Sequence, residues 1–166
     1  MFEISAQELF EQLQQYQETG RVEAKLGSQI GGSIMQTINA FANEPDLGGG
    51  YLLLGVAEPD SEHENYWVAG IENRDKLLNE LQINCREQFE QPVSIQVEEP
   101  QYSVIDGKNV LLIFVPELPA NAKPCTFKGK IDTKNRRKTG VWRRGVNGDY
   151  ECTPSELEPL LIAKIG

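Results

Sequence analysis

Charged side chains that could carry chemistry first come together near the N-terminus. Residues 21–26 alternate between charged and apolar side chains, so a strand over this range would carry Glu23 and Lys25 on one face. The other face would carry Val22, Ala24 and Leu26. A carboxylate beside an ammonium group can contact a cation or a phosphate, and it can also be a simple solvated ion pair. Because register decides which face is buried, we expect the apolar face in the core and the charged face in a cleft.

A second group of candidate residues lies in the basic segment, residues 128–145. This segment holds half of the 16 lysines and arginines of the chain and one acid, Asp132. Arginine binds phosphate with two parallel hydrogen bonds, and an aromatic ring such as Trp142 can stack on a base. The basic residues are Lys128, Lys130, Lys134, Arg136, Arg137, Lys138, Arg143 and Arg144. We predict that the segment contacts the phosphate backbone of a nucleic acid; a solvated loop with a core tryptophan is the alternative.

Composition limits the class of protein. A chain of 166 residues usually forms one domain, and 39% hydrophobic and 25% charged residues are typical of a globular protein. The net charge of −9 argues against nucleic-acid binding by the whole surface. Because the rest of the chain is acidic, the single basic segment is a clearer sign of a local binding surface. The sequence contains no apolar run long enough for a membrane span and no signal-peptide pattern, so we expect a cytoplasmic protein.

The cysteines and the histidine do not indicate a metal centre or a nucleophilic site. Cys85, Cys125 and Cys152 are far apart in the sequence, and no C-x-x-C pair occurs. His63 lies in a very polar stretch, where we expect it to be solvated. These residues favour a reduced protein without structural zinc.

Periodicity and capping patterns predict helices and strands in mixed order. The predicted helices cover about residues 6–17, 28–42, 74–88 and 154–165. The predicted strands cover residues 21–26, 51–56, 66–71, 93–97, 102–105, 110–115 and 139–143, with a hairpin turn at 106–108. This pattern predicts one α+β (mixed α/β) domain over residues 1–166, with a mixed, partly antiparallel sheet covered by helices. Its core would cover about residues 17–150, followed by the terminal helix.

Three consecutive glycines, residues 48–50, could be mistaken for a phosphate-binding loop. A P-loop lies between a strand and a helix and ends in Gly-Lys-Ser/Thr, so that helix N–H groups face the phosphates. Here the glycines lie between a predicted helix and a predicted strand, and no Lys-Ser/Thr follows. The sequence therefore supports no ATP site, and we expect these glycines to end the helix and turn the chain into the core.

A series of short motifs in fixed order resembles the Schlafen AlbA-like domain family, formerly labelled divergent AAA. The motifs are E-x-K at residues 23–25, INAFAN at 38–43, the glycines at 48–50, the apolar strand ending in Gly-Val at 56, and R-x-G at 143–145. The resemblance extends from about residue 17 to the end of the chain. It implies a nucleic-acid-binding domain, and some members of this family cut RNA with clustered carboxylates.

The resemblance also implies a metal site. The RNA-cutting members have two glutamates at the spacing of Glu18 and Glu23, and a third acid after the Gly-Val strand end, where this chain offers Glu58 or Asp60. These carboxylates could hold Mg²⁺ or Mn²⁺, which would activate water and neutralise charge on a phosphodiester. Lys25 could contact that phosphate. Ala24 departs from the family pattern, which has an aromatic residue beside the second glutamate.

Three functions remain open at this stage. The first is nucleic-acid binding (RNA or DNA) through the basic segment. The second is a metal-dependent endoribonuclease that acts on tRNA or another structured RNA. The third is a protein-interaction module that uses the acidic body of the domain. Relatives often pair two domains to form a binding cleft, so a homodimer is also open.

Overall fold

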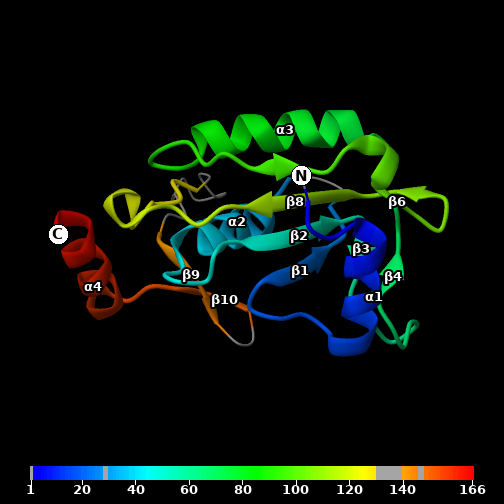
Figure 1. Cartoon of the computed structure of the whole chain (residues 1–166), viewed down its shortest axis with the longest axis horizontal. Coiled ribbons are helices and arrows are strands. Elements are labelled where there is room, and N and C mark those ends of the chain that lie inside the picture. The colour runs from blue at the N-terminus through cyan, green and yellow to red at the C-terminus, as the bar shows by residue number, and fades with distance from the viewer. Residues whose placement is uncertain (1, 28–29, 130–139, 146–147) are drawn as a thin grey trace, which may run out of the picture.

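The computed structural model describes residues 2–27, 30–129, 140–145 and 148–166 (Figure 1). The helices are α1 (Ala6–Tyr16), α2 (Gly32–Asn43), α3 (Arg74–Glu87) and α4 (Pro154–Ile165), with short 3-10 turns η1 (Pro100–Tyr102) and η2 (Ala120–Ala122). The strands are β1 (Val22–Lys25), β2 (Gly50–Leu54), β3 (Val56–Ala57), β4 (Trp67–Val68), β5 (Gln96–Val97), β6 (Val104–Ile105), β7 (Lys108–Asn109), β8 (Leu111–Val115), β9 (Trp142–Gly145) and β10 (Gly148–Glu151).

The central sheet has four strands in the order β1-β2-β8-β5. β1 and β2 are parallel and are connected through α2, whereas β8 runs antiparallel to both β2 and β5. Such a strand–helix–strand unit needs a crossover helix because parallel neighbours cannot be joined by a tight turn. The structure thus has the mixed, partly antiparallel sheet of an α+β domain that the sequence predicts.

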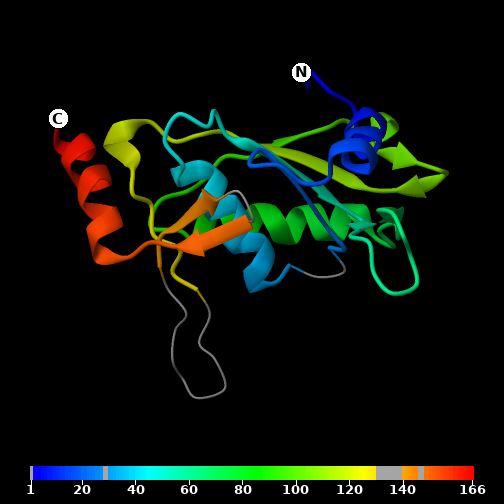
Figure 2. The same ribbon diagram turned by 90° about the horizontal axis from the view of Figure 1, so that it is seen from below.

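Helices cover the two faces of this sheet, and each face contributes to a separate apolar core (Figure 2). Successive side chains of a strand point to opposite faces, so Leu52 and Leu54 pack with α2 and α3 while Leu53 packs with α1. On β8, Ile113 likewise lies on the α2 side and Leu112 on the α1 side. The continuous apolar runs of β2 and β8 are therefore those of strands that are buried on both faces.

The AFAN motif and the glycines after it hold α2 against the sheet. Gly50 lies directly against the Phe41 ring, and any Cβ atom at position 50 would collide with that ring. The side chains of Asn39 and Asn43 both donate to the carbonyl oxygen of Cys125, at 2.8 and 2.9 Å, and are fully buried. The glycines at 48–50 thus turn the chain into the core, as the sequence predicts. They do not end α2, because the helix already stops at Asn43 with Glu44 as its cap.

Local signals predicted several element boundaries. Asn73 caps α3 through a hydrogen bond to the N–H of Lys76, and Thr153 forms a capping box with Glu156 at the start of α4. Asp106 and Gly107 have φ angles of 51° and 74° and connect β6 to β7 in a two-residue hairpin.

Other predictions for individual elements were wrong. Strand β1 ends at Lys25, so Leu26 is 49% exposed and does not share the buried face with Ala24. The predicted strand over 66–71 shrinks to the two residues of β4. Strand β10, which pairs with β9, was not predicted at all. Across the described ranges, none of the helices has both the length and the apolar character that a membrane span requires.

Candidate functional site

Glu23 faces α2 and is almost fully buried. It lies beside Leu52 in the parallel register of β1 and β2, on the sheet face that α2 covers. Its exposed fraction is 9%, and its Oε2 accepts a hydrogen bond of 2.6 Å from the hydroxyl group of Thr37. The charged face of β1 is therefore packed under a helix. The expectation that Glu23 would line an open cleft was wrong because α2 crosses back over this strand.

Asp149 joins Glu23 at the same threonine, which the sequence did not lead us to expect. Its Oδ2 also lies 2.6 Å from the Thr37 hydroxyl oxygen. A hydroxyl group has one proton to donate, so Thr37 satisfies one of these two carboxylates at a time. Asp149 lies directly opposite Arg144 in the β9–β10 pair. The glycines that flank this hairpin, at 145 and 148, were the sequence signal that could have located it.

Arg144 supplies the positive charge for this pair of carboxylates. One of its guanidinium nitrogens lies 2.7 Å from Asp149 Oδ1 and 3.5 Å from Glu23 Oε2. The same guanidinium group donates to the carbonyl oxygens of Thr19 and Gly20, at 2.9 and 3.1 Å. It also lies 4.8 Å from the centre of the Phe41 ring. With an exposed fraction of 7%, Arg144 ties β9 to the start of β1.

Arg143 and Trp142 also have internal partners. Arg143 forms two parallel hydrogen bonds with Glu44, at 3.0 and 2.8 Å, and these bonds raise its pKa above the usual value. Trp142 is half-buried and packs against the core on the α2 side. Of the residues predicted to contact nucleic acid, these two and Arg144 thus hold β9 in place. Their side chains are engaged within the domain.

Glu18 and Glu58 form a second carboxyl pair, at the outer edge of β1. Oε2 of Glu18 accepts a hydrogen bond of 2.9 Å from the backbone N–H of Ala24. Burial raises the pKa of Glu18 to about 8, helped by a hydrogen bond with the Glu58 side chain and by the charges of Glu58 and Glu23. Tyr66 adjoins the pair: burial raises its pKa to about 12, and the two glutamates add to that effect. Glu18 therefore holds its proton near neutral pH.

Asp60 takes no part in the carboxyl pair. Its Oδ1 accepts hydrogen bonds from the backbone N–H groups of Glu62 and His63 and lies 2.9 Å from Nδ1 of the His63 ring. These hydrogen bonds, that of the His63 side chain first, lower the pKa of Asp60. Of the two candidates for a third acid, Glu58 is the one that reaches Glu18. Asp60 instead closes its own exposed loop.

The predicted metal ligands thus divide into two groups. Glu18 and Glu58 lie together, whereas Glu23 is held by Thr37 and Arg144. No three acids, histidines or cysteines within the described ranges are arranged to hold a metal ion. Mg²⁺ is often bound by one or two carboxylates and several waters. The Glu18–Glu58 pair has the composition of such a site. The described residues do not form a cage of three carboxylates.

Lys25 and the described start of the basic segment lie at the surface. The ammonium group of Lys25 donates to the Ser33 hydroxyl at 2.8 Å and lies 3.8 Å from Glu23 Oε2. Lys128 is exposed. Phe127 and Gly140 exchange backbone hydrogen bonds of 2.8 and 3.0 Å, so the two ends of the intervening stretch lie side by side. The other predicted contacts, Lys130, Lys134, Arg136, Arg137 and Lys138, lie outside the described residues.

Comparison with known proteins identifies a family and a similar solved structure. The sequence model of the family described as Schlafen, AlbA_2 matches residues 15–149. A similar solved structure is the NMR structure of the N-terminal domain of a protein from Nitrosomonas europaea related to the ATP-dependent DNA helicase RecG. It is 34% identical, with a TM-score of 0.63, and the match covers 90% of this chain and 94% of that one. No curated protein matches the chain.

Proposed function

Because the chain belongs to the Schlafen AlbA_2 family, we propose that it is a nucleic-acid-binding domain that contacts phosphates through residues 128–138. One observation carries the proposal: six basic residues and one acid fall within eleven positions of a chain whose net charge is −9. Phosphate neutralisation by such a cluster supplies most of the affinity of non-specific binding. The relation of a similar structure to a DNA helicase agrees with a nucleic-acid ligand.

The basic segment divides into an anchor and a contact region under this proposal. Arg143 and Arg144 are the anchor, because Glu44, Asp149 and backbone carbonyl groups already occupy their donors. Lys128 and the basic residues after it are the contact region. The paired backbones of Phe127 and Gly140 fix the positions of the two described residues on either side of this region.

A matched pair of double variants tests the contact region. Replacement of Arg136 and Arg137 by Ala should weaken binding of RNA and DNA duplexes in a filter-binding titration. Each lost phosphate contact should also lower the slope of log K against log salt by about 0.9. The control replaces Arg86 and Lys164, which are exposed on α3 and α4, and removes the same charge. Equal affinity and slope for the two double variants would rule out the proposed role.

The Glu18–Glu58 pair favours a second candidate function, metal-dependent cleavage of structured RNA. Mg²⁺ or Mn²⁺ bound there would supply an activated water and a positive charge near the scissile phosphate. Glu18 and Glu58 would hold the ion once Glu18 has lost its proton. Lys25, whose side chain is 21% exposed, would contact the phosphate.

Two measurements with Mn²⁺ test this second function. Addition of the ion should raise the melting temperature, because a ligand that binds only the folded state stabilises it, and tRNA should be cleaved. Glu18→Gln should abolish both effects, whereas Glu64→Gln, at an exposed loop residue, should keep them. A wild-type protein with neither effect would leave binding as the only function.

A further inference from the structure

A groove lies between the start of the chain and the edge of the central sheet, apart from both carboxyl pairs. Its volume is about 700 Å³, within the ~300–1,000 Å³ usual for binding pockets. Residues 2–5 and Glu8 line one side, and residues 96–99 with Tyr102 line the other. In Figure 1 the chain starts over this side of the sheet and runs down to α1.

Buried contacts hold the two sides of this groove in place. Glu98 is 5% exposed and accepts hydrogen bonds from the Ala6 N–H at 3.2 Å and from the Ser103 hydroxyl at 2.9 Å. It therefore ties the start of α1 to the segment that follows β5. Arg74 of α3 donates to the carbonyl oxygens of Pro100 and Ser103, at 3.2 and 3.1 Å, and so fixes η1. A groove that is formed before its ligand arrives loses little free energy in ordering on binding.

The groove combines apolar side chains with an acidic rim. Among the described residues that line it, every charged side chain is a glutamate: Glu98 is buried, and three others are exposed. The exposed ones are Glu3, Glu8 and Glu99. The apolar side chains include Phe2 and Ile4, which are half-buried, and Tyr102, which is 60% exposed. Tyrosine is enriched at the energetic centres of protein interfaces. A complementary ligand therefore carries positive charges beside apolar groups.

The backbone of β5 offers hydrogen bonds to the same ligand. β5 lies at the edge of the four-stranded sheet, and the N–H of the next residue, Glu98, donates to the Leu112 carbonyl at 3.0 Å. In the alternating pattern of an antiparallel ladder, the Val97 N–H and C=O then point away from β8. The groove touches four consecutive residues, 96–99, whose side chains alternate between faces, so it runs along this edge. An extended peptide can pair there as a short additional strand.

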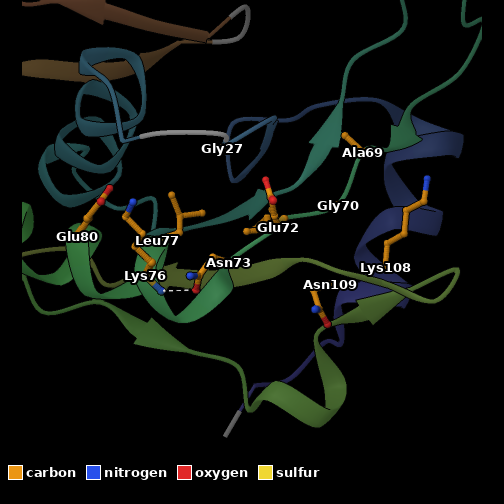
Figure 3. Close-up of a pocket in the computed structure, with 11 residues that line it drawn as sticks. Gly27, Ala69, Gly70, Glu72, Asn73, Lys76, Leu77, Glu80, Lys108 and Asn109 are labelled. Atoms are coloured by element: carbon orange, nitrogen blue, oxygen red, sulfur yellow. Dashed lines mark hydrogen bonds between the residues drawn. The ribbon is translucent and has the colours of Figure 1, made fainter.

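A larger hollow between α3 and β7 has no such preference for charge (Figure 3). Lys76 and Lys108 lie on opposite sides of it. They are balanced by Glu72 and Glu80, so the charged side chains of its described lining sum to zero. The acidic groove, in contrast, selects its ligand by charge as well as by shape.

From these features we infer that the groove binds an extended segment of a partner protein in which basic and apolar side chains alternate. Successive side chains of a strand point in opposite directions, so such a segment places its lysines or arginines at the exposed glutamates and its apolar side chains against Phe2, Ile4 and Tyr102. Its backbone pairs with Val97. The same glutamates repel a phosphate backbone, so this interaction goes beyond the proposed nucleic-acid-binding function.

NMR titration of the ¹⁵N-labelled protein with synthetic pentapeptides tests the groove directly. A peptide of alternating lysine and valine should shift the amide resonances of Ile4, Val97, Glu99 and Tyr102. A peptide of alternating glutamate and valine should bind at least tenfold more weakly, because the acidic rim repels it. Equal affinity of the two peptides, or shifts that fall outside the groove, would overturn the inference.

Two further ligands distinguish an extended peptide from a simple polycation. Spermidine carries three positive charges but neither apolar side chains nor peptide groups, so it should bind at least tenfold more weakly than the lysine–valine peptide. Methylation of the inner amide nitrogens of that peptide removes its donors to the Val97 carbonyl and should also weaken binding. If spermidine binds as tightly, or if the methylated peptide loses no affinity, the groove does not take an extended segment.

A matched pair of double variants separates the groove from the acidic surface as a whole. Glu3→Lys with Glu99→Lys should weaken the lysine–valine peptide at least tenfold. Glu64→Lys with Glu158→Lys makes the same change of charge at exposed positions elsewhere and should have little effect. All four positions are exposed, so both double variants should melt like the wild type. Equal weakening by the two would show general attraction to an acidic protein and would refute the assigned surface.

Sedimentation of the protein at increasing concentration tests whether a second copy of this chain is the occupant instead. Residues 128–138 contain six basic residues and one acid, but Ile131 is the single large apolar residue among them. A synthetic peptide of this sequence should therefore bind the groove more weakly than the lysine–valine peptide. A concentration-dependent dimer that the Glu3→Lys and Glu99→Lys double variant dissociates would place a second copy in the groove and would overturn the assignment to a partner protein.

Discussion

Glu18→Gln should stabilise the folded domain at neutral and alkaline pH. In the folded state, burial and the Glu58 side chain raise the pKa of Glu18 from 4.5 to about 8. Wild-type Glu18 therefore holds its proton in the folded protein at pH 7 but ionises on unfolding. A glutamine resembles the protonated form: its amide oxygen can accept from the Ala24 N–H, and its NH₂ group can donate to Glu58. The substitution keeps the contacts and removes the titration.

The sign of the pH dependence follows from proton linkage. Below pH 4.5 the group is protonated in both states, and its contribution to stability is complete. Between pH 4.5 and 8 the folded state binds more protons than the unfolded state, so wild-type stability falls as pH rises. Above pH 8 both states are ionised and the loss is complete. Glu98, whose pKa burial also raises, contributes in the same direction, so only the difference between variant and wild type isolates Glu18.

The size of the effect follows from the pKa shift. At 1.36 kcal/mol per pKa unit the shift would give at most about 5 kcal/mol. Solvent reaches part of this carboxyl group, so we expect a difference of about 2 kcal/mol after discounting for screening. For a chain of this length that corresponds to a melting temperature higher by about 4–8 °C.

Urea unfolding at a series of pH values between 4 and 9 measures this difference. The stabilities of Glu18→Gln and wild type should be closest near pH 4 and should diverge up to about pH 8. Glu64→Gln, at an exposed residue, should follow the wild type throughout. If the Glu18→Gln and wild-type curves are parallel, or if the variant is the less stable protein at pH 8, then Glu18 does not hold its proton in the folded protein at neutral pH and the reasoning fails.

Three further predictions concern packing and ion pairs. Gly50→Ala should cost about 1–3 kcal/mol in thermal denaturation, because the methyl group meets the Phe41 ring; an unchanged melting temperature would show that α2 shifts freely. Arg144→Met should cost about 3–5 kcal/mol in urea unfolding, since it leaves buried carboxylates without their counter-ion; a neutral result would mean that water reaches them. Arg143→Lys should lower stability by about 1 kcal/mol, because lysine cannot form the two parallel bonds to Glu44. Addition of Glu44→Gln should then cost little more, and a full second loss would contradict the pairing.

Local chemistry explains which parts of this structure could be predicted from the sequence. The Asn73 cap, the Thr153 capping box and the Asp106–Gly107 turn each depend on residues within a few positions. Alternation within the short stretch before position 26 suggested the strand but not its end. Most helices and strands were therefore found, although β10 was missed and several strands end elsewhere than expected.

The composition of the candidate site depends on long-range pairing, which no local pattern reports. Arg144 reaches the carbonyl group of Thr19, 125 positions earlier, and Asp149 meets Glu23 only because α2 brings Thr37 between them. The interpretation of Arg144 as a surface phosphate contact could not foresee this burial. The family resemblance named two candidates for the third acid, and only the fold shows that Glu58 reaches Glu18.

The position of Glu18 also affects the exposed edge of the central sheet. β1 is an edge strand, and an uncovered edge invites a strand from another chain to pair with it. Thr19 and Val22 exchange backbone hydrogen bonds, and the Glu18 side chain accepts a hydrogen bond from the outward N–H of Ala24. The opposite edge, β5, is only two residues long. By the same argument we expect Glu18 to protect the domain from edge-to-edge aggregation. This role would favour a carboxyl or amide side chain at position 18 whether or not the domain has a catalytic function.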